Sequence, residues 1–122
     1  MKAFFDLTPV ELELMEMFWN ASEPLSFREI MEYLNSVLKK DWKKQTLNTY
    51  LSSMQKDGLV KTERSSYHYR YCAAYTKDEY VQQWTRKLVK NSYGDSLSSF
   101  VAAFTAGEKL SEEERERLRK LI

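Results

Sequence analysis

The residues of this chain that could do chemistry gather in the stretch WKKQTLNTYLSSMQK, which begins at Trp42. At about 100° per residue, one side of a helix through this stretch would carry only amides, hydroxyls and one lysine. These residues are Gln45, Asn48, Thr49, Ser52, Ser53 and Lys56. Amides can pair with adenine through two hydrogen bonds, hydroxyls can bond to bases or phosphates, and the preceding Lys43 and Lys44 suit a phosphate backbone. The pattern predicts a surface that reads DNA.

An ordinary solvated helix face is the alternative explanation of these polar residues. Such faces usually mix Glu with Lys, as the segment SEEERERLRK from Ser111 does, whereas this face contains no acid. The segment that follows it adds the basic side chains of Lys61, Arg64 and Arg70. Position and composition together support DNA binding as well as they support the solvated face.

The charges of the chain are unevenly distributed, although the formal net charge is only +1. Residues 1–38 hold two basic and seven acidic side chains, a balance of −5. Residues 39–90 hold twelve basic and five acidic side chains, a balance of +7, and residues 91–122 have a balance of −1. The middle segment is therefore a candidate phosphate-binding surface.

Several classes of function are disfavoured by composition. With one cysteine, Cys72, and one histidine, His68, the chain offers neither paired metal ligands nor a catalytic triad, and it has no Gly-rich phosphate loop. We therefore expect no enzyme, metal or cofactor. No apolar run approaches the roughly 18 residues that span a bilayer, and the N-terminal segment turns acidic too early for a secretory signal. A cytoplasmic protein without a membrane partner is expected, and the roles of Cys72 and His68 stay open.

Three helices are predicted to position the polar face. Capping boxes, in which a Ser or Thr is followed three residues later by Glu, mark the starts of the first two. Leu47, Tyr50, Leu51 and Met54 provide the inner side of the third, and Gly58 suits its C-terminal end. The predicted bounds are Thr8 to about Asn20, Ser26 to about Lys40, and Trp42–Lys44 to Gly58.

From Leu59 the apolar period changes to two, which predicts a hairpin that turns at Ser65-Ser66. Tyr67, Tyr69 and Tyr71 share one face of its second strand, where core packing is favoured over stacking on bases. Three helices followed by a hairpin is the order of a winged helix-turn-helix, whose third helix enters the major groove. Any other small α+β domain is the alternative.

A second helical block of roughly 45 residues follows, and three helices of this size make a poor independent core. Pairing with a second copy is the simplest way to bury their apolar stripes. The expected interface residues are Trp84, Leu88, Leu97, Phe100, Val101 and Phe104. The predicted fold is mostly α with a small β-hairpin: a winged helix-turn-helix DNA-binding domain of residues 1–74, followed by a three-helix dimerisation domain of residues 75–122.

Over nearly its whole length, the chain resembles the penicillinase-repressor family of bacterial winged-helix regulators, the BlaI/MecI/CopY group. The resemblance rests on the segments LTPVELELMEMFWN, FREIMEYLN, DWKKQTLNTYLSSMQKDGLVKTE, YHYRYCAAYTKDEY and SLSSFVAAFTAGEKLSEEERERLRKLI. It implies a homodimer that binds a palindromic operator and blocks transcription until a signal releases it. Carried over by position, the DNA-contacting residues would be Lys43, Lys44, Gln45, Thr46, Asn48, Thr49 and Ser53.

The chain also departs from the family pattern. Members often have Ser-Pro where this chain has Lys43-Lys44, so the operator sequence is not carried over. In antibiotic-responsive members a signalling protease cuts an Asn-Phe bond in the dimerisation segment. The matching bond is Ala103-Phe104, which keeps the Phe and lacks the Asn. Copper-responsive members end in Cys-x-Cys pairs, which this chain does not have, so copper sensing is disfavoured.

The sequence therefore predicts a homodimeric transcriptional repressor whose partner is double-stranded operator DNA. Ser52, Lys56 and Arg64 join the residues named above as expected DNA contacts. The alternative is a winged-helix module that uses its basic face for acidic proteins and does not bind DNA sequence-specifically. Replacing Asn48 or Thr49 would separate the two, because only a sequence reader would lose specificity.

Overall fold

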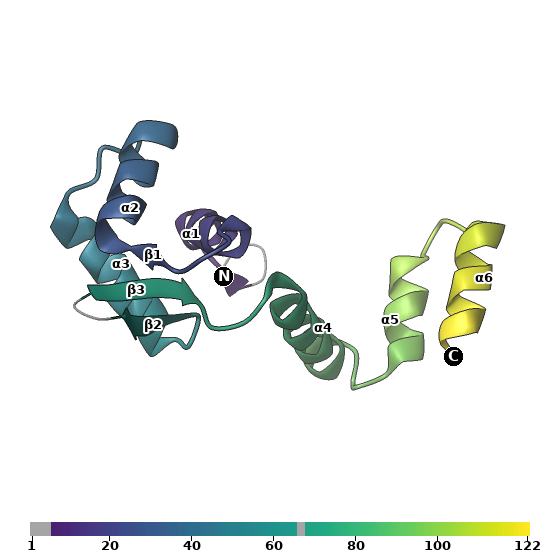
Figure 1. The fold of residues 1–122 in the computed structure, drawn as a ribbon. Helices are drawn as coiled ribbons and strands as arrows, with labels where there is room; N and C mark the ends of the chain where they lie inside the picture. The colour runs from purple at the N-terminus through teal and green to yellow at the C-terminus, as the bar shows by residue number, and fades with distance from the viewer. Residues whose placement is uncertain (1–5, 66–67) are drawn as a thin grey trace. The chain divides into compact units, whose positions relative to one another are not determined.

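The structure is a computed structural model that describes residues 6–65 and 68–122 (Figure 1). Its residues divide into two compact units, Met1–Val81 and Gln82–Ile122. The elements in chain order are α1 (Pro9–Asn20), β1 (Leu25–Ser26), α2 (Phe27–Glu32), the π-helical turn η2 (Tyr33–Val37), α3 (Lys44–Lys56), β2 (Val60–Ser65), β3 (His68–Ala73), α4 (Lys77–Ser92), α5 (Leu97–Phe104) and α6 (Glu112–Leu121). The predicted class, mostly α with a small β-hairpin, is confirmed. Two positions of the predicted hairpin, Ser66 and Tyr67, lie outside the described residues.

Reciprocal capping boxes fix the starts of α1, α2 and α4. At α1 the hydroxyl of Thr8 accepts from the backbone N–H of Glu11 (3.1 Å), and the Glu11 carboxylate accepts from the N–H of Thr8 (2.9 Å). Each box satisfies two N–H groups that a helix start leaves without partners. The same pairing occurs at Ser26 with Glu29, as predicted, and at Thr76 with Glu79, where the sequence has the same Ser/Thr-to-Glu spacing.

The second predicted helix has a different end from the expected one. α2 is regular to Glu32, and the chain then widens into η2, where the N–H of Leu38 bonds to the carbonyl of Tyr33 (3.2 Å). Such π turns are uncommon and often occur at functional sites. The connection to α3 contains two residues with positive φ, Lys39 and Asp41, both at 55°. The helix therefore ends at Val37 rather than near Lys40, because η2 turns the chain towards α3.

The sheet has three antiparallel strands in the order β1-β3-β2. Strands β2 and β3 form the predicted hairpin, with a register that begins at Val60 opposite Ala73. Ser65 was predicted to lie in the turn, but it is the last residue of β2 and lies opposite His68. The third strand, β1, was not predicted. It pairs Leu25 with Tyr71, and two residues are too short for an alternating pattern to be detected.

The core of the N-terminal unit is built from the apolar sides of the first three helices and the start of β2. The predicted inner residues Leu47, Leu51 and Met54 are fully buried, whereas Tyr50 is half-buried and stacks on Trp42 with ring centroids 4.8 Å apart. Burying side chains of this size stabilises a fold by about 1.5–3 kcal/mol each. The other buried apolar residues are Leu7, Leu14, Met15, Met17, Phe18, Ile30, Leu34 and Val60.

The C-terminal unit has no comparable core. None of residues 82–122, all of which the structure describes, is buried. Phe100 contacts Tyr93 edge-on with centroids 5.5 Å apart and lies 6.4 Å from Phe104, so an aromatic row runs from the end of α4 along α5. Leu97 is 60% exposed and Phe104 is 75% exposed. The unit thus exposes apolar side chains of α5 to solvent.

Candidate nucleic-acid interface

Helix α3 presents the predicted polar face to solvent. Because Leu47, Leu51 and Met54 are buried on its other side, the rotation of the helix is fixed. No acidic residue lies in its first turn. The predicted residues that are exposed on or beside α3 are Lys43, Lys44, Gln45, Thr46, Asn48, Thr49, Ser52, Ser53 and Lys56. The helix therefore brings amide, hydroxyl and ammonium groups together on one surface.

The N-terminus of α3 is suited to an anion. Lys43 occupies the N-cap position without a side-chain hydrogen bond, and its carbonyl accepts from the N–H groups of Thr46 (3.0 Å) and Leu47 (3.3 Å). The first N–H groups of a helix carry partial positive charge and favour negatively charged groups. With Lys43 and Lys44 at this end, the first turn can receive a backbone phosphate.

Two amide side chains on α3 are available to bind base edges. Among the described residues, no hydrogen bond engages the carboxamide of Gln45 or of Asn48. The hydroxyl of Thr49 instead donates to the carbonyl of Gln45 (2.9 Å), so it retains acceptor capacity only. Amides of this kind pair with adenine in the major groove.

One edge of this face is different in charge. Thr49 and Ser53 line a shallow recess of about 460 Å³ together with the start of α1, and the carboxylates of Glu11 and Asp57 lie in the same lining. Carboxylates repel phosphate but can accept from the amino group of cytosine. Of these two, the Glu11 carboxylate is buried and accepts from the Thr8 N–H, whereas Asp57 is exposed and could make such a contact. This edge suits contact with bases more than contact with the backbone.

A side chain that the sequence analysis missed holds the start of α3. The carboxamide of Asn35, on η2, accepts from the N–H of Trp42 (2.7 Å) and donates to the Trp42 carbonyl (3.0 Å). Lys40 in the same connection pairs with Glu13 of α1 at 2.8 Å. These contacts join the α2–α3 connection to both earlier helices. No local sequence pattern predicts these contacts, because each depends on the path of the α2–α3 connection.

The hairpin places a basic side chain beside α3, which packs against β2 (Figure 1). Arg64 is exposed on β2, and its guanidinium carbon lies 5.7 Å from the ring centroid of Tyr69 on β3. Tyr69 is 58% exposed, so the prediction that the tyrosines pack in the core is wrong for this residue; Tyr71 is half-buried. Tyr69 therefore lies beyond the core, where its ring faces the guanidinium of Arg64 instead.

The sequence placed Arg70 among the basic side chains beside the polar face, but in the structure its guanidinium is bound by other groups of the protein. Its guanidinium pairs with the carboxylate of Glu29 (3.0 Å) and donates to the carbonyl of Pro24 (3.3 Å). Hydrogen bonds from the Ser26 backbone and hydroxyl, followed by the charge of Arg70, lower the pKa of Glu29. Arg70 therefore ties β3 to the start of α2.

The two residues with open roles lie on the same strand. His68 is exposed at the start of β3, and Cys72 is half-buried near its end. Burial, and secondly the charge of Glu63, raise the pKa of the Cys72 thiol, which disfavours the reactive thiolate. Among the described residues, no group of three or more His, Cys, Asp or Glu side chains could hold a metal ion. Over the same ranges, no helix is long and apolar enough to cross a bilayer.

The residues expected at a dimer interface all lie in the C-terminal unit. Leu97 and Phe104 are exposed, while Trp84, Leu88, Phe100 and Val101 are half-buried. Ala103 and Phe104, the position that matches the regulatory cleavage bond, are both exposed at the end of α5.

The chain matches a known protein family over most of its length. A profile of the family described as Penicillinase repressor matches residues 7–122. The methicillin resistance regulatory protein MecI of Staphylococcus aureus strain N315 is 22% identical over 118 residues, which cover 97% of this chain and 94% of that protein. The penicillinase repressor of Bacillus licheniformis is 23% identical over 122 residues, which cover 100% of this chain and 93% of that protein. The chain, with its winged helix and its exposed C-terminal helices, belongs to the penicillinase repressor family.

Proposed function

We propose that this protein is a transcriptional repressor that binds double-stranded operator DNA through α3 and the β2–β3 hairpin. The observation that carries the proposal is the acid-free polar face of α3, which is exposed while Leu47, Leu51 and Met54 on the opposite side are fully buried. A helix held in this way can enter a major groove without repelling phosphate. Membership of a family whose named members are repressors supports the same function.

Base contacts and phosphate contacts are assigned to different residues. Gln45 and Asn48 read base edges through their carboxamides, Thr49 accepts beside them, and Ser52 and Ser53 accept or donate. Lys43, Lys44 and the first turn of α3 bind the phosphate backbone, Lys56 extends this charge, and Arg64 binds DNA beside the helix. Thr46, at the edge of the face, completes the proposed set.

The protein acts as a homodimer, with residues 1–74 binding DNA and residues 75–122 dimerising. The apolar surface of the C-terminal unit supports this, because its helices bury no residue within one chain. A partner that covers Leu97, Phe100 and Phe104 would supply the missing core. A two-fold dimer requires a palindromic operator, whose half-sites lie roughly 34 to 36 Å apart or a multiple of that distance. Release by a signal then restores transcription.

Two substitutions test the assignment of these roles. Asn48→Ala should cost about 1–3 kcal/mol of binding free energy on the operator and leave binding to unrelated DNA nearly unchanged. Lys43→Ala should weaken binding to both the operator and unrelated DNA by similar factors, because a phosphate contact carries no sequence information. Both are measured by fluorescence anisotropy with operator and scrambled duplexes at one fixed salt concentration. Equal losses on both duplexes for Asn48→Ala would contradict the role of α3 in reading sequence.

A further inference from the structure

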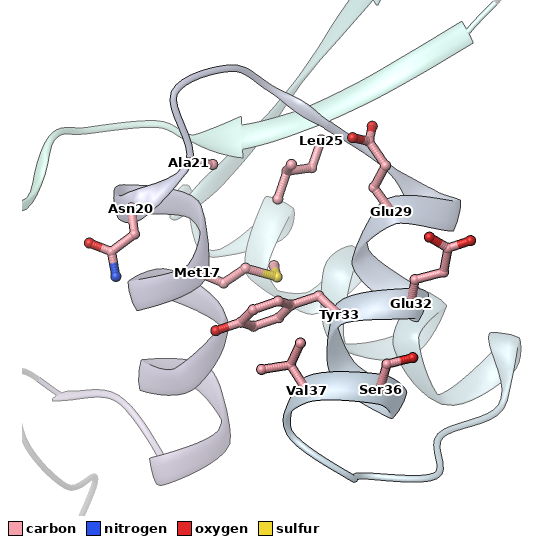
Figure 2. A pocket seen from close by; sticks show the side chains of 9 residues that line it. All are labelled: Met17, Asn20, Ala21, Leu25, Glu29, Glu32, Tyr33, Ser36 and Val37. Atoms are coloured by element: carbon pink, nitrogen blue, oxygen red, sulfur yellow. The ribbon is translucent and has the colours of Figure 1, made fainter.

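A groove between α1 and the α2–η2 helix is not used by the proposed DNA-binding surface. It has a volume of about 580 Å³, within the range of about 300–1,000 Å³ that is usual for small-molecule sites. In Figure 2, the side chain of Met17 on α1 and the ring of Tyr33 point towards one another across it, with Val37 beside them. Val37 is 61% exposed and Tyr33 37%, so the groove keeps apolar surface open to solvent.

The polar groups of this groove are mostly acidic. Its lining includes Glu29 and Glu32, whose carboxylates Figure 2 shows on the α2 side, and it includes no lysine or arginine. A second recess shares Met17 and Tyr33 with it and adds two further acidic residues, Glu13 and Glu16, again without a base. A ligand in the groove would therefore contact apolar surface and negative charge together.

Each of these carboxylates has a basic partner that lies outside the lining. Glu29 is held by Arg70, Glu13 by Lys40 and Glu16 by Lys77, with nitrogen–oxygen distances of 2.8–3.0 Å. Glu32 is the most weakly held, because its partner Arg28 is at 3.3 Å and the two side chains are 65% and 89% exposed. Exposed pairs of this kind contribute little energy. Glu32 is thus the carboxylate that an incoming cation could engage most easily.

We propose that this groove binds a small lipophilic cation, and that its occupation weakens the binding of DNA by α3. The apolar lining selects a hydrophobic body, and the carboxylates of Glu29 and Glu32 select positive over negative charge. The second half of the proposal rests on the proposed function. It gives the release signal of the repressor a chemical class.

The coupling between the groove and α3 passes through η2. Tyr33, Ser36 and Val37, which line the groove, belong to the same turn as Asn35. Asn35 holds the backbone of Trp42 by two hydrogen bonds, and Trp42 stacks on Tyr50 of α3. A ligand between α1 and η2 that displaces this turn therefore alters the hold on the start of α3, where phosphate is bound. The ligand can shift the equilibrium only by its difference in affinity for the two arrangements.

The binding half is tested on the full chain by isothermal titration calorimetry without DNA. The probes are tetraphenylphosphonium and its anionic counterpart of similar size and shape, tetraphenylborate. We expect the cation to bind at least about ten-fold more tightly than the anion, since the groove rim is acidic. Equal affinity for the two probes, or tighter binding of the anion, would overturn the charge assignment.

Two variants locate the site. Ser36→Phe fills the groove from an exposed position and should reduce cation affinity more than ten-fold, whereas Ser98→Phe, at an exposed position of α5, should not reduce it. Glu32→Gln keeps the shape and should reduce cation affinity about three- to ten-fold, with Glu113→Gln on α6 as its matched control. If Ser36→Phe folds, as judged by circular dichroism, and still binds the cation as tightly as the wild type does, then the probe binds elsewhere.

The coupling half is tested by operator binding with and without tetraphenylphosphonium, using tetramethylammonium at the same concentration as the ionic control. We expect the lipophilic cation to weaken operator binding at least about five-fold in the wild type, and Ser36→Phe to remove this effect. Cation binding without any change in operator affinity would overturn the coupling. A failure of the wild type to bind operator in the absence of probe would instead count against the proposed function, so the two failures are distinguishable.

Discussion

The carboxamide of Asn35 forms two hydrogen bonds with the backbone of a single residue, Trp42, accepting from its N–H at 2.7 Å and donating to its carbonyl at 3.0 Å. This pair closes the connection between η2 and α3, which contains two residues with positive φ. Helix α3 has no side-chain cap at its N-terminus. The two hydrogen bonds of Asn35 fix where the helix begins instead.

Replacing Asn35 should therefore affect both stability and DNA binding. Asn35→Ala leaves two part-buried backbone groups without partners and should lower the free energy of unfolding by about 1–3 kcal/mol. It should also weaken binding to operator and unrelated DNA alike, because the first turn of α3, which we propose to bind phosphate, is no longer held. Urea denaturation and anisotropy measure the two effects. Asn91→Ala, at an exposed position of α4, is the control, and equal stability of the two variants would contradict the role of Asn35.

A charge in the aromatic row of the C-terminal unit should disrupt the proposed dimer. Phe100→Asp places a carboxylate between Tyr93 and Phe104, where a dimer would bury it at high cost. We expect a shift towards monomer in sedimentation velocity and weaker operator binding, because the two half-sites are no longer bound by one linked pair. Ser98→Asp adds the same charge at an exposed position of the same helix and should remain dimeric. An unchanged dimer for Phe100→Asp would remove this residue from the interface.

Arg64 in the hairpin should act as a phosphate contact of moderate strength. Arg64→Ala should weaken binding to all DNA sequences and reduce the slope of log affinity against log salt by about one. Arg117→Ala removes one positive charge from α6 and serves as the charge-matched control, with an unchanged slope expected. A loss confined to the operator would show instead that Arg64 reads bases.

The capping box of α4 should make a pH-dependent contribution to stability. Hydrogen bonds from the Thr76 backbone and hydroxyl lower the pKa of Glu79 below its ordinary value of 4.5. The folded state therefore binds this proton less tightly than the unfolded state does. The stabilisation is fully present above about pH 4.5 and is lost as the pH falls through the lower pKa of the folded state.

Glu79→Gln provides the matched variant, since glutamine can accept the same hydrogen bonds without titrating. Wild type should be more stable than Glu79→Gln at pH 7, and the difference should shrink as the pH is lowered from 5 to about 3 in urea denaturation series. A difference that stays constant over this range would show that the charge of Glu79 does not contribute.

Most elements of the fold could be predicted because their signals are local. The pairs Thr8 with Glu11, Ser26 with Glu29 and Thr76 with Glu79 lie three residues apart and mark helix starts directly. The exposed polar face of α3 also followed from spacing alone. Strand β1 could not be predicted, since it consists of two residues that depend on a partner far along the chain.

The details of the site required tertiary contacts. Arg70 and Arg64 are both basic residues of one hairpin, yet Arg70 pairs with Glu29 while Arg64 stays exposed. Tyr69 has the same alternation as Tyr71 but lies beyond the edge of the core. Neither difference is visible in the period of the sequence, because it depends on where the core ends.

The most direct test of the account is fluorescence anisotropy of the purified protein on the DNA upstream of its own gene, against a scrambled duplex, across a salt series. We predict sequence-selective binding that saturates at two protomers per site, with a tighter operator complex at every salt concentration. Weak binding that is equal on both duplexes and disappears with added salt would contradict it. The basic face of α3 would then be a surface for an acidic protein.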